Sequence, residues 1–116
     1  MSMIYKDLPK SYASRIIAAL NELHPEIQAT ILSEDRMLYQ LGFARDVPCT
    51  LELQITVEQA ETIWYELISF ESDAYGYSNE QMKDPFFRQQ QKEREAYYKK
   101  FAFLEELMLE IMHQEG

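Results

Sequence analysis

The chain has 116 residues, of which 47% are hydrophobic and 13% aromatic, and this is enough for one folded domain with a modest core. The formal net charge is −9. Residues 1–57 hold five basic and seven acidic side chains, net −2, whereas residues 58–116 hold six and thirteen, net −7. Direct binding to nucleic acid or to an anionic membrane is disfavoured, because both require clustered Lys and Arg side chains. A basic surface on another protein is the partner that this charge favours.

The only cysteine, Cys49, excludes an internal disulfide and is expected to be a small buried hydrophobe rather than a nucleophile. The first ten residues are polar and no apolar run follows them, so no signal peptide is expected. No segment approaches the ~20 apolar residues that span a bilayer. We therefore expect a cytoplasmic protein that folds as a single domain over residues 1–116.

Residues 7–23 have the pattern of a helix. Asp7 can cap its start, Pro9 suits a first turn, and apolar residues recur at helical spacing from Ala13 to Leu23. Pro25 ends the helix, and residues 27–32 then alternate between apolar and polar side chains, which predicts a strand.

Residues 37–43 also alternate, with Met37, Tyr39, Leu41 and Phe43 on one side, and this predicts a second strand. A helix over residues 33–41, closed by Gly42, is the alternative. The sequence pattern does not distinguish this helix from the strand.

The clearest alternation in the chain is that of residues 48–56, which predict a strand with one buried side. Its apolar side consists of Cys49, Leu51, Leu53 and Ile55. Because the three predicted strands have short connections, we expect an antiparallel meander rather than a parallel sheet.

Two capping-box patterns follow, Thr56–Gln59 and Ser78–Gln81, and each predicts the start of a helix. The helix that begins at Thr56 should end near Gly76. The helical region that begins at Ser78 should run through Pro85 to about Gln114. The predicted fold is therefore α+β: a helix, a three-stranded antiparallel meander, and two helices, the last one long, packed on one face of the sheet.

The segment between Arg45 and Lys83 contains no basic residue. It holds acidic residues together with aromatic residues that we expect to be exposed. Acids steer a protein toward basic partners, and aromatics supply binding hot spots. We therefore expect a partner-binding surface made of Glu52, Glu58, Glu61, Glu66, Glu71, Asp73, Tyr75 and Tyr77. The corresponding function is that of a regulator or inhibitor that docks on a basic surface of a partner protein. If the partner is a nucleic-acid-binding enzyme, the chain could act by mimicking its nucleic acid.

An alternative function is self-assembly. The C-terminal helix is apolar on more than one side, which is typical either of a helix in the centre of a fold or of one that pairs with another chain. The seam of a homodimer would then consist of Tyr97, Phe101, Leu104, Met108 and Ile111.

An enzyme is not expected. Three glycines are too few for a phosphate-binding loop, and no Gly-x-Ser-x-Gly nucleophile motif is present. Glu110 and His113 form one Glu-x-x-His step, whereas a di-metal helix bundle needs two such steps and two further glutamates. A metal-dependent enzyme built on these two residues is the least favoured alternative, and we expect neither a metal nor a cofactor.

Overall fold

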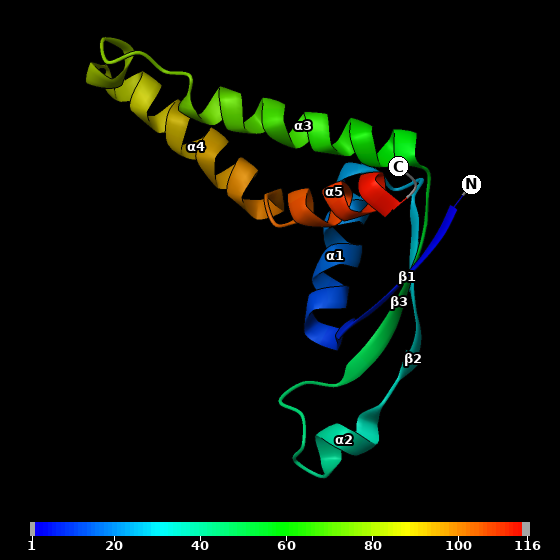
Figure 1. Ribbon diagram of the computed structural model, residues 1–116. Helices are drawn as coiled ribbons and strands as arrows, with labels where there is room; N and C mark the ends of the chain where they lie inside the picture. Colours follow the sequence, from blue (N-terminus) through cyan, green and yellow to red (C-terminus); the bar gives the residue numbers. More distant parts are fainter. Residues whose placement is uncertain (1, 115–116) are drawn as a thin grey trace. The chain divides into compact units, whose positions relative to one another are not determined.

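The computed structural model describes residues 2–114 and confirms the α+β class, with a three-stranded antiparallel sheet and several helices (Figure 1). Residue contacts divide the chain into two compact units, Met1–Thr56 and Val57–Gly116, each of which is described by itself. The single domain, and the packing of the C-terminal helices on the sheet, stay predictions. No helix within residues 2–114 is long and apolar enough to cross a membrane.

The first unit is built around its central strand. The strands are β1 (Ser2–Pro9), β2 (Gln28–Glu34) and β3 (Pro48–Ile55), in the order β1-β3-β2, and β3 is antiparallel to both neighbours. Side chains of β3 are alternately buried and half-buried, as the sequence predicts. The buried ones are Cys49, Leu51, Leu53 and Ile55.

The N-terminal strand β1 was not expected from the sequence, which predicts a helix from Asp7. Ile4 is paired with Leu53 and Leu8 with Cys49, so this segment lies in the sheet up to Pro9. The predicted helix cap at Asp7 is wrong, because the Asp7 carboxylate accepts a hydrogen bond from the Thr50 hydroxyl at 2.9 Å.

Helix α1 (Lys10–Leu23) begins at the residue after β1 and packs against all three strands. Its buried residues are Ala13, Ile16, Ala19 and Leu20. The loop before β3 satisfies its first backbone amides: the Lys10 amide donates to the Val47 carbonyl at 2.8 Å, and the Ser11 amide to the Asp46 carboxylate at 3.2 Å. A distant acid therefore takes the capping role that the sequence assigns to Asp7.

The strand predicted over residues 37–43 is wrong. Arg36–Gln40 form a short helix, α2, between β2 and β3, which agrees in part with the helical alternative. Gly42 closes this helix with a φ of 81°, a conformation that favours glycine. The third strand is β1 instead, so the sheet is not a meander: β1 and β2 lie on opposite sides of β3.

The second unit consists of α3 (Val57–Tyr75), a 3-10 turn η1 (Gln81–Lys83), α4 (Pro85–Phe101) and α5 (Leu104–Gln114). Helix α3 begins where the sequence predicts and packs against both α4 and α5. The expected single long last helix is wrong, because a turn at Ala102 and Phe103 divides it. Neither Gly nor Pro stands there, so the sequence carries no breaker signal.

The second predicted capping box is confirmed. The Gln81 amide donates to the Ser78 hydroxyl at 3.2 Å, and the Ser78 amide donates back to the Gln81 side chain at 2.9 Å. Three residues later the Asp84 carboxylate accepts from the Phe86 amide at 2.9 Å, with Pro85 in the first turn of α4. Two successive caps thus set the start of α4.

Substitution Leu51→Ala is expected to destabilise the protein by about 3 kcal/mol, because it opens a cavity at a fully buried position of the central strand. The free energy of unfolding in urea measures this. Gln54→Ala, on the other side of the same strand, is the matched control and should change stability by no more than about 0.5 kcal/mol. Equal effects of the two substitutions would contradict the described orientation of β3.

Gly42→Ala is expected to cost about 1 kcal/mol of stability, because a side chain at a φ of 81° is strained. No atom lies within 4 Å of the added Cβ, so the cost is one of backbone conformation alone. Gly42→Asn is the control: Asn tolerates this conformation better and should lose less. Urea unfolding of both variants compares them, and an Asn variant less stable than the Ala variant would argue against this cause.

Candidate functional site

Helix α3 carries most of the predicted partner-binding residues. Its 19 residues include five acids and no basic residue. Glu58, Glu61 and Asp73 are exposed, and no ion pair engages them among the residues that the structure describes. These three carboxylates are therefore available to a partner.

The rotation of about 100° per residue places Glu58, Glu61 and Asp73 on one side of α3. Tyr65 lies on the same side and is 59% exposed, and Glu66 lies at its edge, half-buried. We call Glu58, Glu61, Tyr65, Glu66 and Asp73 the acidic face. Tyr65 was not among the predicted partner-binding residues, although its position four residues after Glu61 is a signal that could have placed it there.

Glu71 is not part of the acidic face. It lies on the opposite side of α3, where the Tyr98 hydroxyl of α4 is 3.3 Å from its carboxylate. The same hydroxyl is 3.1 Å from the Glu105 carboxylate of α5. Desolvation, together with these two carboxylates, raises the pKa of Tyr98 to about 12. Glu71 thus belongs to a contact among the three helices of this unit.

The predicted aromatic anchors lie where α3 ends and α4 begins. Tyr75 is exposed, with its ring edge-on to Tyr98 at 6.1 Å. Tyr77 is half-buried: its hydroxyl donates to Gln90 at 2.9 Å, and its ring lies 6.3 Å from that of Phe87. Tyr77 therefore holds the connection between the helices, and only Tyr75 presents its ring to solvent.

Glu52 lies on the outer side of β3, half-buried, between Tyr5 of β1 and Thr30 of β2. It belongs to the first unit, whereas the other seven predicted partner-binding residues belong to the second. The continuity of Glu52 with the acidic face stays a prediction.

The predicted self-association seam is mostly buried. Phe101, Leu104, Met108 and Ile111 are at most 1% exposed, whereas Tyr97 is 45% exposed and packs edge-on against Phe70 and Phe101. Of the five residues, only Tyr97 offers surface to a second chain.

The residues considered for catalysis or metal binding are Cys49, Glu110 and His113. Cys49 is buried, and desolvation raises the pKa of its thiol, as do the nearby Glu34 and Asp46. A neutral buried thiol suits packing rather than nucleophilic attack. Within residues 2–114, no three His, Cys, Asp or Glu side chains come together as a metal site, and Glu110 and His113 lie on the exposed side of α5.

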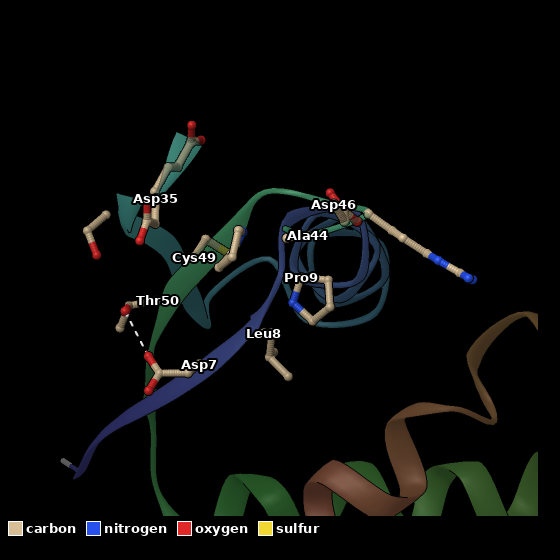
Figure 2. A pocket seen from close by; sticks show the side chains of 12 residues that line it. Asp7, Leu8, Pro9, Asp35, Ala44, Asp46, Cys49 and Thr50 are labelled. Carbon is tan, nitrogen blue, oxygen red and sulfur yellow. Dashed lines mark hydrogen bonds between the residues drawn. The ribbon is translucent and has the colours of Figure 1, made fainter. Parts of the chain in front are cut away.

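A hollow of about 600 Å³ lies in the first unit, beside the start of β3 (Figure 2). Its walls include Leu8, Pro9, Ala44 and Pro48, and four carboxylates surround them: Asp7, Glu34, Asp35 and Asp46. Figure 2 shows the Thr50 hydroxyl bonded to Asp7 at one side of it.

Two carboxylates of this hollow, Glu34 and Asp46, are engaged in ionic and hydrogen-bond contacts within the fold. Lys10 and Arg36 each lie 2.9 Å from Glu34 and lower its pKa. A hydrogen bond from the Ser11 hydroxyl lowers the pKa of Asp46. We therefore interpret the hollow as the junction between the end of the sheet and the loop before β3 rather than as a ligand site.

A second surface was missed by sequence reasoning. Residues 36–43 are all exposed, and they include Met37, Leu38, Tyr39, Leu41 and Phe43. The alternation of these side chains suggested a strand with a buried side, whereas nothing in the described chain covers them. The sequence signal for this exposed surface was a run of apolar residues between two charged turns, with no strand available to pair with it.

Comparison of the sequence with protein-family models found no match, and searches of curated proteins and of solved structures also found none.

Tyr98→Phe should remove the phenol whose pKa is raised to about 12, and spectrophotometric titration of the protein can detect this loss. The raised pKa means that the neutral phenol stabilises the folded state. Its contribution is complete below pH 10, the pKa of an unperturbed tyrosine, and is lost as the pH rises toward 12. Tyr39→Phe, at an exposed phenol, is the control and should keep the late titration. A late phenol that persists in Tyr98→Phe would refute this assignment.

Proposed function

We propose that this chain is a small non-enzymatic interaction protein that regulates or inhibits a partner protein by docking on a basic surface of that partner. One observation supports this proposal above the others: Glu58, Glu61 and Asp73 of the acidic face are exposed carboxylates that form no ion pair within residues 2–114. The docking residues are Glu58, Glu61 and Asp73, with Tyr65 as the anchor among them.

Two cations of α4 have partners other than the acidic face. Lys99 lies 2.6 Å from Glu95, and the Arg94 guanidinium lies over the Tyr77 ring at 5.7 Å from its centroid. Unneutralised carboxylates attract a basic partner and accelerate its association, and an exposed tyrosine adds apolar contact area at a small cost in entropy.

The charge density favours docking on a protein over close imitation of DNA. Glu58 and Asp73 are fifteen residues apart, which is about 22 Å along a helix that rises 1.5 Å per residue. Duplex DNA carries roughly 13 phosphate charges over that length, whereas the acidic face carries four carboxylates. A nucleic-acid mimic would therefore cover only part of a DNA-binding groove.

The triple substitution Glu58→Lys, Glu61→Lys, Asp73→Lys tests the proposal. Proteins captured from native extract on the immobilised chain would be quantified by mass spectrometry at low and at high salt. We expect the specific partner to fall by about tenfold in the variant, since three attractive contacts become repulsive. Capture by the unmodified chain should also fall as the salt rises from roughly 0.05 to 0.5 M.

The matched control is Glu22→Lys, Glu106→Lys, Glu110→Lys, which changes the net charge equally at exposed acids that are not part of the acidic face. This control should retain the partner. Equal capture by the two triple variants would refute the proposal. Release of the captured partner by duplex DNA would identify it as a nucleic-acid-binding protein and favour the mimic mode.

A further inference from the structure

The proposed function gives no role to the exposed apolar surface at the tip of the β2–β3 hairpin. This surface consists of residues 36–43, and we call it the hairpin tip. Figure 1 shows α2 beyond the end of the sheet in the first unit. Phe43 is 78% exposed, Met37 66% and Leu41 62%, and Tyr39 and Leu38 are also exposed. Five large apolar side chains within eight residues contribute nothing to the core of the described chain.

Local hydrogen bonds give the hairpin tip a fixed shape. The Asp35 carboxylate accepts from the Leu38 amide at 3.5 Å, at the start of α2. At its end the Phe43 amide donates to the Leu38 carbonyl at 2.9 Å, and the Gly42 amide to the Tyr39 carbonyl at 3.1 Å. This pair of bonds around a glycine is the Schellman motif. The apolar side chains are thus presented on a formed turn, which lowers the entropy cost of binding.

The exposed apolar area is on the order of 500 Å², which is near the upper end for the largest patch of a monomer. Two such patches in contact would bury roughly 1,000 Å², at the low end of specific interfaces. The area is therefore sufficient for a weak dimer, with a dissociation constant in the micromolar range.

The charges at the base of the hairpin tip are self-complementary. Arg36 is already paired with Glu34 at 2.9 Å, and Asp46 is bonded to Ser11. Asp35 and Arg45 are exposed, and neither has an ion pair within residues 2–114. One acid and one base, neither of them in an ion pair, thus flank the apolar segment in the sequence, and both line the hollow at its base.

We propose that the hairpin tip is the contact of a two-fold symmetric dimer of this chain. In such a contact each surface meets its own copy, so the Arg45 of each copy can lie opposite the Asp35 of the other. The apolar side chains between them supply the affinity, and the two ion pairs fix the orientation. The acidic face of α3 has no part in this contact.

Sedimentation velocity of the whole chain between roughly 1 and 200 µM tests the proposal. We expect the mass to rise from 13.8 kDa toward twice this value as the concentration increases. Leu41→Asp with Phe43→Asp should weaken the dimer by at least about tenfold, because two apolar contacts are replaced by charges. Both side chains are exposed, so circular dichroism should show an unchanged fold.

The control pair is Tyr65→Asp with Phe86→Asp, which adds the same charges at exposed aromatics of the second unit and should leave the dimer intact. A monomer at every concentration, or equal loss of the dimer in both pairs, would overturn the proposal. Co-sedimentation of a monomeric chain with phosphatidylcholine–phosphatidylserine vesicles would assign the hairpin tip to lipid instead.

A charge exchange tests the orientation. Asp35→Lys and Arg45→Asp, made singly, should each weaken the dimer by roughly fivefold, since each substitution affects both symmetric ion pairs. The double variant should recover most of this loss, because the charges again face their opposites. The lost helix cap at Asp35 is common to the single and the double variant and cannot produce the recovery. A double variant weaker than both single variants would refute the two-fold pairing.

Discussion

The first unit depends on one constraint: β3 must bury alternate side chains while both of its edges are paired. Leu51 and Leu53 are fully buried, and only β3 has a neighbouring strand on each side. The register of β1 and β2 follows, since their apolar side chains must lie on the same side of the sheet. Helix α1 covers that side, and the loop before β3 in turn caps the start of α1 through Asp46.

The sequence predicts an element well where its own pattern is sufficient. The alternation of β3 and the reciprocal cap of Ser78 and Gln81 are signals that lie within a few residues of each other, and both are found in the structure. β1 was missed because its place in the sheet is decided by residues more than 40 positions away, such as Leu53 opposite Ile4. The single-sequence pattern contains no information about that partner.

Residues 37–43 show the opposite failure. Their alternation is as regular as that of a strand, yet the local backbone bonds around Gly42 and the cap at Asp35 decide the structure. Alternation predicts a strand only where a second strand and a covering layer are present, and the described chain supplies neither there. An apolar pattern without a partner in the chain indicates a surface for something outside it.

The acidic stretch of α3 was visible in the sequence, but the side of the helix on which each acid lies was decided by packing. Glu71 turned toward Tyr98 and Glu105, whereas Tyr65 turned outward with Glu61. Spacing along a helix predicts which residues share a side, and the position of α4 decides which side is buried. Of the eight predicted partner-binding residues, five lie on the exposed side of α3, at the edge of that side or at the end of the helix: Glu58, Glu61, Glu66, Asp73 and Tyr75.

The acidic face and the hairpin tip differ in the physics of binding. Exposed carboxylates lose attraction as salt screens them, whereas apolar contact is not weakened by screening and is strengthened by salts excluded from protein surfaces. The acidic face carries four carboxylates around one tyrosine, and the hairpin tip carries five apolar side chains between one unpaired acid and one unpaired base. Rising ionic strength therefore weakens docking through the acidic face more than contact through the hairpin tip, which makes their contributions separable in a chain that carries both.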